Sequence, residues 1–296
     1  MKRRVTFQES TNTLVGNLHL PPDFNETGSY PAVIVQGSLT SVKEQMSGLY
    51  AEKLADQSIL ALAFDYSHYG ESDGQPRQYE SPEQKLADLN AAVAYLAGLP
   101  YVRAVGMLGV CTSGGNVPYL AARNPQLKAG ATVAAWLAEP GVSDTLLYGG
   151  AAGIAKLRQA GAGAAERYAD TGENELIQAY SNVNASASHL GPMEYYMDQA
   201  RGGGVPQWLN ALAVQSWGNW LDFNPMGQAA QVRIPMLIVH SDGCALPDQA
   251  RKFHELLAGP KELYWAEGNH FDFYDQPAQV ADAVGKASRF FKKHLN

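Results

Sequence analysis

The stretch GMLGVCTSGGN, residues 106–116, decides the fold that this sequence predicts. It starts as an apolar run, which is typical of a buried strand, and ends in small residues that fit the first turn of a helix. A nucleophile in the pattern Gly-x-nucleophile-x-Gly sits in a strained turn, so small neighbours are needed where strand and helix approach each other. We therefore interpret Cys111, which stands at this turn, as a candidate nucleophile.

Two residues compete for the position of the nucleophile. The preferred frame, GVCTS, places Cys111 at the turn and replaces the second glycine of the pattern with Ser113, which is also small. The rival frame makes Ser113 the nucleophile, with Gly115 two residues after it. We prefer Cys111, because residues 106–110 then supply the strand and the glycine pair falls in the first helical turn. A helix N-terminus also stabilises a thiolate, although free cysteines commonly only pack in a core, and that alternative stays open.

Strands and helices alternate on both sides of this turn. Near-continuous apolar runs at 31–37, 59–66 and 234–241 are typical of strands covered on both faces. Alternating apolar and polar residues at 4–10 and 13–21 predict an antiparallel hairpin at a sheet edge. The sequence therefore predicts an α/β fold with a mostly parallel, doubly wound sheet, in which ligands bind at the carboxyl ends of the strands.

Residues 139–228 interrupt that alternation. They are rich in Ala, Gly, Tyr and Trp, and they predict helices and loops between two strands of the core. We expect a core of residues 1–138 and 229–296, with residues 139–228 inserted as a helical cap over the site. An acyl pocket is expected beneath the cap, although packing within the cap is an equal alternative for its aromatic residues. The residues expected to line this pocket are His68, Trp136, Tyr148, Tyr195, Tyr196, Trp208, Trp217 and Trp220.

A thiolate nucleophile needs a base, and the imidazole of that base must be held by an acid. Of the seven histidines, His270 lies in the loop after the last apolar strand and is the preferred base. His68, in a loop at the same end of the sheet, is its competitor. Asp242 follows the penultimate strand and completes the order nucleophile, acid, histidine, although an aspartate there also suits a turn or a helix cap. Asp272 and Glu267 are the alternative acids.

An acyl-transfer site must also stabilise an oxyanion with backbone N–H groups. The amide of Thr112, directly after the candidate nucleophile, is one expected donor. The other is expected from the loop after the strand 31–37, where Ser38 or Leu39 is the candidate. The alternative for this loop is that its polar residues only connect a strand to a helix.

Charge and composition disfavour two classes of partner. The formal net charge of -7 gives no electrostatic reason to bind nucleic acid or an anionic membrane. No segment is apolar and long enough to span a bilayer, and the N-terminus lacks the apolar stretch of a secretory signal. We therefore expect a cytoplasmic protein, in which the two cysteines, Cys111 and Cys244, are free thiols.

With these residues in place, the sequence resembles the α/β-hydrolase superfamily, and within it a bacterial and fungal branch similar to dienelactone hydrolase and to polyketide-transferase-like hydrolases. The segments that carry this resemblance are VKEQMSGLYAEKLADQ (42–57), ALAFDYSHYGESDGQPR (61–77), the helix leading into LPYV (99–102), GVCTSGG (109–115) and NHFDFYD (269–275). The resemblance implies an acyl-enzyme on Cys111, with no metal ion and no organic cofactor. Two features depart from the superfamily: Gln36 replaces a common histidine of the oxyanion loop, and GCALP after Asp242 departs from the commonest acid-loop spacing.

The first functional hypothesis is a hydrolase that cleaves an ester or thioester of a small apolar or aromatic acyl group through a Cys111, His270 and Asp242 triad. The second is an acyltransferase on the same fold, which passes the acyl group to an alcohol or amine. The third is a ligand-binding protein without turnover. A small-molecule acyl substrate is the expected partner, and the oligomeric state stays open, a homo-oligomer included.

Overall fold

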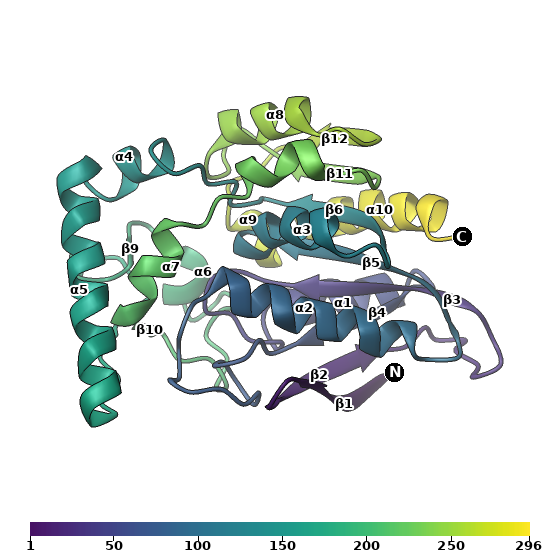
Figure 1. Ribbon diagram of the computed structural model, residues 1–296. Coiled ribbons are helices and arrows are strands. Elements are labelled where there is room, and N and C mark those ends of the chain that lie inside the picture. The colour runs from purple at the N-terminus through teal and green to yellow at the C-terminus, as the bar shows by residue number, and fades with distance from the viewer.

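The computed structural model describes residues 1–143, 145 and 147–296, and its centre is an eight-stranded sheet (Figure 1). The strand order is β1-β2-β4-β3-β5-β6-β11-β12. The strands are β1 Lys2–Glu9, β2 Asn12–His19, β3 Tyr30–Gln36, β4 Leu60–Phe64, β5 Val102–Val110, β6 Leu127–Val133, β11 Met236–His240 and β12 Lys261–Trp265. β1 pairs antiparallel with β2, and β2 with β4, whereas the other neighbours are parallel. The predicted sheet, mostly parallel with an N-terminal antiparallel hairpin, is confirmed.

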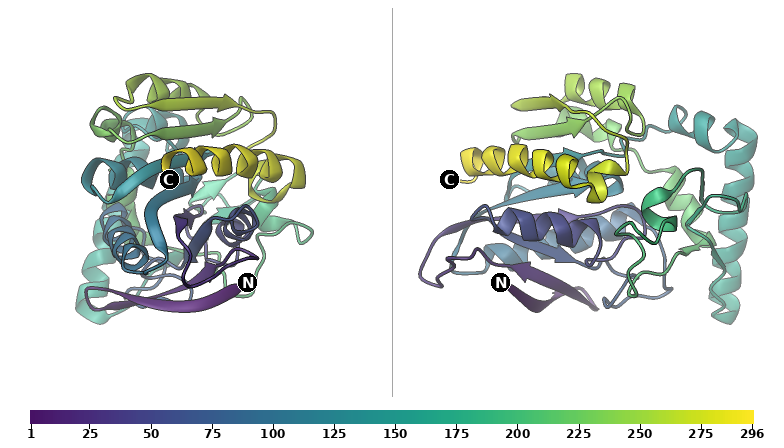
Figure 2. Two further views of the ribbon diagram at one scale, coloured as in Figure 1. Left: turned by 90° about the vertical axis from the view of Figure 1, so that its right-hand side faces the viewer. Right: turned by 180° about the vertical axis from the view of Figure 1, so that it is seen from behind.

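Helices cover both faces of this sheet (Figure 2). Buried side chains of α1 (Met46–Ala55) and α10 (Pro277–His294) belong to one hydrophobic cluster. Those of α2 (Pro82–Ala97), α3 (Thr112–Arg123) and α8 (Pro247–Leu256) belong to a second cluster on the opposite face. The sheet is therefore doubly wound, as the alternation predicts. None of the helices formed by the described residues combines the length and the apolar composition that crossing a bilayer requires.

The helix α2 begins where its sequence signals indicate. Ser81 is the N-cap, and its hydroxyl oxygen accepts a hydrogen bond from the Gln84 amide at 3.2 Å. Pro82 occupies the first helical position, where its missing N–H group leaves no hydrogen bond unmade. The start of α2 therefore follows from local sequence signals.

Residues 139–228, which we call the cap segment, follow β6 and precede the last two strands. They form the helices α4 Ser143–Leu147, α5 Gly150–Thr171, α6 Glu194–Met197 and α7 Trp217–Leu221 and the 3-10 helix η1 Val214–Ser216. A second 3-10 helix, η2 Met226–Gln231, begins inside the cap segment and ends three residues after it. Two small sheets join them, β7 Leu176–Ile177 with β10 Leu212–Ala213, and β8 Tyr180–Ser181 with β9 His189–Leu190. The segment is thus helical with small strands, and α5 stands across the end of the main sheet that lies away from the termini (Figure 1). The division into core and cap stays a prediction.

Hydrogen bonds and an ion pair hold the cap segment to the core at two places. The amide of Ala213 donates to the Gln78 carbonyl at 2.8 Å, and the amide of Glu80 donates to the Ser216 hydroxyl at 2.9 Å. Arg201 forms an ion pair with Asp275 at 2.6 Å. These bonds reach the loop before α2 and the short helix α9 (Asp272–Asp275), so the cap segment is held at two separate places.

The turn from β5 into α3 allows no side chain at Gly109. A Cβ atom there would lie 2.1 Å from the Ser113 carbonyl oxygen, which is backbone and cannot move aside. We expect Gly109→Ala to lower the free energy of unfolding by about 1–3 kcal/mol or more, as overpacked cores do. The matched control is Gly218→Ala in α7, where an added Cβ meets nothing within 4 Å. Urea denaturation of both variants measures the difference, and equal midpoints would contradict the close packing at the turn.

Candidate active site

Cys111 occupies the turn between β5 and α3 with φ 54° and ψ -119°. A positive φ at a residue other than glycine stores about 1–3 kcal/mol of strain, so the surroundings must hold it. The Cys111 amide donates to the Val133 carbonyl at 3.1 Å, and the Cys111 carbonyl accepts from the amides of Gly114 at 2.9 Å and Trp136 at 2.8 Å. The structure therefore places Cys111 at a strained turn between strand and helix, which is the position that the sequence suggests for the nucleophile.

The Cys111 side chain lines a cavity of about 310 Å³, which we call the thiol cavity. Its walls come from the loops after β3, β5, β6, β11 and β12 and from the cap segment. The lining residues are Leu39, Cys111, Thr112, Trp136, Tyr180, His189, Met193, Gly243, Cys244, Ala245, His270, Phe271 and Tyr274. The structure thus brings Cys111 and His270 to one cavity at the carboxyl ends of the parallel strands.

Ser113, the rival nucleophile, faces different surroundings. It is fully buried as the second residue of α3, and its hydroxyl hydrogen-bonds with the Tyr66 hydroxyl at 3.2 Å. Its amide donates to the Gly37 carbonyl at 3.2 Å. Ser113 does not belong to the lining of the thiol cavity.

Tyr274 connects the imidazole of His270 with the thiol of Cys111. Nδ1 of His270 accepts a hydrogen bond from the Ala245 amide at 3.2 Å, and Nε2 lies 3.1 Å from the Tyr274 hydroxyl oxygen. Since a neutral imidazole carries one proton, the bonding pattern assigns that proton to Nε2, which donates to Tyr274. The Tyr274 hydroxyl also lies close enough to the Cys111 thiol to lower the pKa of that thiol.

Burial keeps this group of residues neutral. It raises the pKa of Cys111, and the hydrogen bonds from Tyr274 and Thr112 lower it by less. It also lowers the pKa of His270 to about 3, with smaller contributions from His240 and His189. Burial therefore opposes the thiolate that a helix N-terminus would stabilise. The thiolate at Cys111 stays a prediction, and burial favours a neutral thiol beside a neutral imidazole.

The structure does not bring Asp242 to His270. The Asp242 side chain is 76% exposed, and its carboxylate forms an ion pair with Arg251 that lowers its pKa. Nδ1 of His270, which an acid would have to hold, accepts from the Ala245 amide instead. The alternative acids do not fill this place, because Asp272 accepts from the Asn269 amide at 2.7 Å and Glu267 is exposed. The loop geometry after β11 gives the physical reason, since it turns the backbone of Ala245 rather than a carboxylate toward the ring.

The expected oxyanion donors occupy two different positions. Thr112 is the first residue of α3 and lines the thiol cavity, and its amide has no acceptor within its own helix. Leu39 lines the same cavity, whereas Ser38 is buried behind it. Gln36 takes no part, because its side-chain amide donates to the Phe64 carbonyl at 3.0 Å.

Polar tips of cap aromatic residues hold the loop that carries Leu39. The Tyr180 hydroxyl donates to the Leu39 carbonyl at 2.8 Å, and the indole N–H of Trp208 donates to the Thr40 hydroxyl at 3.3 Å. The Tyr196 hydroxyl makes a short hydrogen bond with the Ser38 hydroxyl. The rings of Tyr180 and Tyr196 stack with centroids 3.8 Å apart. These residues therefore position the loop in addition to packing the cap.

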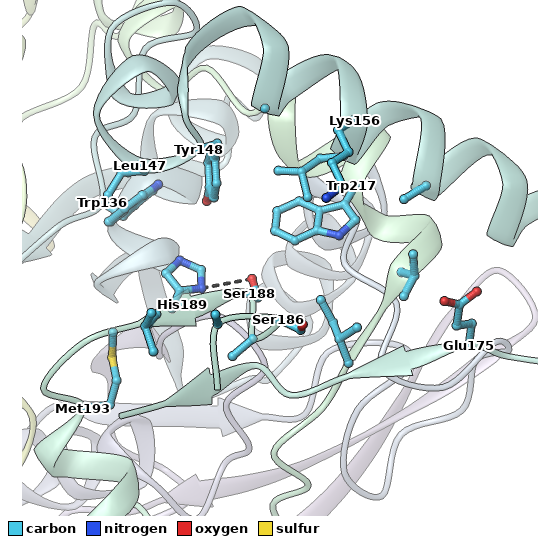
Figure 3. A pocket seen from close by; sticks show the side chains of 18 residues that line it. Trp136, Leu147, Tyr148, Lys156, Glu175, Ser186, Ser188, His189, Met193 and Trp217 are labelled. Carbon is cyan, nitrogen blue, oxygen red and sulfur yellow. Dashed lines mark hydrogen bonds between the residues drawn. The ribbon is translucent and has the colours of Figure 1, made fainter. Parts of the chain in front are cut away.

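A second hollow, which we call the cap groove, has a volume of about 760 Å³ (Figure 3). Of the residues predicted for the acyl pocket, Trp136, Tyr148 and Trp217 line it, and Trp136 lines the thiol cavity as well. The predicted residues that line neither hollow are His68, Tyr195, Tyr196, Trp208 and Trp220.

Local contacts explain why these five residues lie elsewhere. Nδ1 of His68 is 2.9 Å from the Pro76 carbonyl oxygen, so this histidine is held within its own loop. Tyr195 packs edge-on against Tyr274, with ring centroids 5.0 Å apart. Trp220 donates its indole N–H to the Tyr148 hydroxyl at 2.6 Å and stacks on Trp136. Tyr196 and Trp208 hold the loop after β3.

Sequence reasoning missed several residues of the thiol cavity. Tyr274 lies four residues after His270, and this spacing around a helix start is a signal that could have found it. Cys244 lies two residues after Asp242 in the same loop. Burial raises the pKa of its thiol to about 11, and the thiol lies 3.2 Å from the Ser241 hydroxyl. His189 comes from the cap segment, where no sequence pattern indicates which residues turn inward. Among the described residues, no three His, Cys, Asp or Glu side chains are grouped so that they could hold a metal ion.

Comparisons with known proteins identify relatives along most of the chain. A family model described as X-Pro dipeptidyl-peptidase (S15 family) matches residues 13–272. The uncharacterized protein YcjY of Escherichia coli K12 is 28% identical over the full length of both chains. The thiohydrolase aneE of Aspergillus aculeatus is 25% identical over 81% of this chain and 78% of its own.

Solved structures agree with the fold. The hypothetical protein PA2218 of Pseudomonas aeruginosa has a TM-score of 0.86 at 26% identity and covers 100% of this chain and 94% of its own. The resemblance to polyketide transferases and dienelactone hydrolases is found as well. The polyketide transferase claH of Penicillium crustosum is 25% identical over 81% of each chain, and a dienelactone hydrolase of Anabaena variabilis has a TM-score of 0.60 at 14% identity, covering 100% of this chain and 99% of its own. The α/β-hydrolase fold is thereby confirmed.

The pKa of the buried thiol gives a test that needs no substrate. Because burial raises the pKa of Cys111, we expect slow alkylation by iodoacetamide near neutral pH and a rate that still increases above about pH 9. Unfolding in urea removes the burial, and the midpoint should then fall to about 8.5. Mass spectrometry of the two cysteine peptides measures both rates, with Cys244 as the internal comparison. A native midpoint at or below about pH 7 would show that the resting thiol is ionised.

Proposed function

The chain belongs to the X-Pro dipeptidyl-peptidase (S15) family of α/β-hydrolases, and on this premise we propose that it hydrolyses esters or thioesters of an apolar acyl group through an acyl-enzyme on Cys111. The observation that carries the proposal is the place of the Cys111 thiol. It stands at a strained turn, inside a mostly apolar cavity that also holds Tyr274 and His270. A relative named as a thiohydrolase supports the thioester as substrate.

The lining of the thiol cavity favours an acyl ester over a peptide with a free N-terminus. Among the residues described as lining it, none is acidic, so no carboxylate there would pair with the ammonium group of a dipeptide. Burying such a charge without a partner is costly. An acyl group without charge suits the apolar walls, which include Leu39, Met193 and Phe271.

The reaction begins with removal of the thiol proton, which passes through the Tyr274 hydroxyl to Nε2 of His270. This step requires the imidazole tautomer that carries its proton on Nδ1. The ring must therefore first lose its Nε2 proton to water and gain a proton from water on Nδ1, with the Ala245 amide no longer donating to Nδ1 when substrate binds. Cys111 Sγ then forms a bond to the carbonyl carbon, and the oxyanion accepts hydrogen bonds from the amides of Thr112 and Leu39. The bond from carbon to the leaving alcohol or thiol breaks, and the leaving group takes the proton from His270.

Water completes the cycle by attacking the acyl-enzyme. His270 accepts a proton from this water, the bond between the acyl carbon and Cys111 Sγ breaks, and the thiol regains its proton. The products are the carboxylic acid and the free enzyme.

Replacing the thiol tests the nucleophile directly. We expect Cys111→Ala to abolish turnover of nitrophenyl esters and to prevent an acyl adduct in intact-mass measurements, because Cys111 carries the thiol that lines the cavity at the turn, whereas Ser113 does not line it. Ser113→Ala removes only a hydrogen bond to Tyr66, so it should keep most activity. Loss of activity in Ser113→Ala with retention in Cys111→Ala would transfer the nucleophile to Ser113.

Three variants test how the proton moves. His270→Ala should lower kcat by about two to four orders of magnitude, which is typical of a positioned acid–base group. Tyr274→Phe breaks the connection between His270 and the thiol, so its kcat should fall by about tenfold or more, with a shifted pH profile. Asp242→Asn should stay close to wild type, because its carboxylate is exposed and pairs with Arg251. An Asp242→Asn loss as large as that of His270→Ala would restore Asp242 as the acid of a triad.

Acyl transfer and simple binding give different products from hydrolysis. A transferase forms the same adduct on Cys111 but passes the acyl group to an added alcohol or amine, and product analysis with such acceptors detects this. A ligand-binding protein without turnover gives neither an adduct nor a burst of nitrophenol.

A further inference from the structure

The thiol cavity and the cap groove meet at a shared wall. Trp136, His189 and Met193 line both hollows, so these three side chains lie between the thiol cavity and the groove. Pockets for single small molecules commonly measure about 300–1,000 Å³. At about 310 Å³ the thiol cavity lies at the low end of this range, whereas the groove at about 760 Å³ lies in its upper part. The larger space is therefore the one that lies farther from the thiol.

Apolar side chains that remain open to solvent form much of the wall of the cap groove, together with the charged and polar residues Lys156, Glu175, Ser186 and Ser188. Gly153, Leu157 and Ala160 lie on one face of α5 and form one wall. Leu147 and Leu190, which also line the groove, are 45% and 53% exposed. Large apolar side chains gathered at an exposed hollow are typical of a ligand-binding groove. Because the groove and the thiol cavity share three lining residues, the occupant that we infer for the groove is a further part of the same substrate.

His189 supplies a polar atom to an otherwise apolar passage. Figure 3 shows it beside Trp136 and Met193 at one end of the groove, with Glu175 at the other end. Nδ1 of His189 is 3.0 Å from the Ser188 hydroxyl, and burial lowers the pKa of the ring to about 4, so the ring is neutral. Nε2 has no hydrogen bond with the part of the chain that the structure describes.

Aromatic rings on three sides fix the orientation of His189. Its ring centroid lies 5.5 Å from that of Tyr180, 5.9 Å from that of Trp136 and 6.0 Å from that of Trp220. A side chain held in this way presents Nε2 at one place, where a ligand oxygen can hydrogen-bond with it at little cost in conformational entropy.

We propose that the acyl chain of the substrate runs from Cys111 past His189 into the cap groove, and that it carries an oxygen substituent where it passes His189. The substrate class is then an extended acyl ester or thioester with a hydroxyl or keto group near its carbonyl end. This inference rests on the proposed function and adds the substrate of the same site.

Two tryptophan variants of α5 test the path of the chain. Ala160 lines the groove, whereas Ala155, also exposed on the same helix, does not. For wild type we expect kcat/KM to rise from acetyl to dodecanoyl nitrophenyl ester. In Ala160→Trp the ratio of kcat/KM for the long ester to that for the short one should fall at least about tenfold through KM, because a buried indole displaces several methylene groups. The matched control, Ala155→Trp, should keep the wild-type ratio.

The oxygen substituent is tested with a pair of thioesters of equal length, one with a hydroxyl group near the carbonyl and one without. Wild type should prefer the hydroxylated thioester by about 3- to 10-fold, the size of one hydrogen bond, and His189→Leu should lose this preference. Equal preference in both proteins would overturn the role of His189.

The outcomes separate this inference from the proposed function. Turnover of acetyl ester with an adduct on Cys111, but the same long-to-short ratio in wild type and Ala160→Trp, would overturn the path into the groove while the hydrolase stands. No adduct and no turnover with any ester would overturn both. Thermal unfolding of the two tryptophan variants at similar temperatures confirms that the comparison concerns binding and not folding.

Discussion

The strained turn at Cys111 is the constraint on which the rest of the site depends. With φ at 54°, the residue holds its conformation only because both of its backbone polar groups are bound, the amide to Val133 and the carbonyl to Gly114 and Trp136. These partners belong to the neighbouring strand, the helix that follows and the loop beyond β6. The sheet, the helix and the route into the cap segment are thus fixed relative to the thiol by the same three hydrogen bonds. A side chain at Gly109 would collide with this arrangement, so the turn also restricts the sequence around it.

Burial determines the resting chemistry of the site. It raises the pKa of the thiol and lowers that of the His270 imidazole, so both groups are neutral before substrate arrives. Separating charge between them costs more in this cavity than in water, and hydrogen bonds from Tyr274 and Thr112 offset only part of that cost. The ionic form of the pair must therefore arise while the substrate carbonyl is present to receive the thiolate.

The sequence predicted the parts of the molecule that follow from local pattern. Apolar runs and amphipathic segments predict the sheet and the helices that cover it. Ser81 and Pro82 predict the start of α2, and the small residues around Cys111 predict the turn from strand to helix. Motif order placed His270 correctly in the same cavity. Motif order could not settle the acid, because whether Asp242 faces the ring depends on how the loop between β11 and α8 turns, and here the Ala245 amide faces the ring.

The roles of the aromatic residues in the cap segment could not be predicted from the sequence, for a different reason. An aromatic side chain has the same composition signal whether it lines a cavity, packs in a core or uses its polar tip as a hydrogen-bond donor. Tyr148 and Trp217 line the groove, whereas Tyr196 and Trp208 support the loop after β3, and nothing in their spacing separates the two roles. Only the tertiary contacts distinguish them.

Tyr180 joins the binding and catalytic parts of the site. Its hydroxyl donates to the Leu39 carbonyl, its face stacks on Tyr196, and its ring lies beside His189 at the entrance to the cap groove. The backbone that would stabilise an oxyanion and the histidine that would contact the acyl chain are therefore supported by one side chain. If an acyl chain fills the groove as proposed, it contacts His189, whose ring lies beside that of Tyr180, and binding far from the thiol would then act on the position of Leu39. This coupling allows the binding energy of a long acyl chain to act at the carbonyl group. A short acyl group does not reach the groove and therefore supplies no such binding energy.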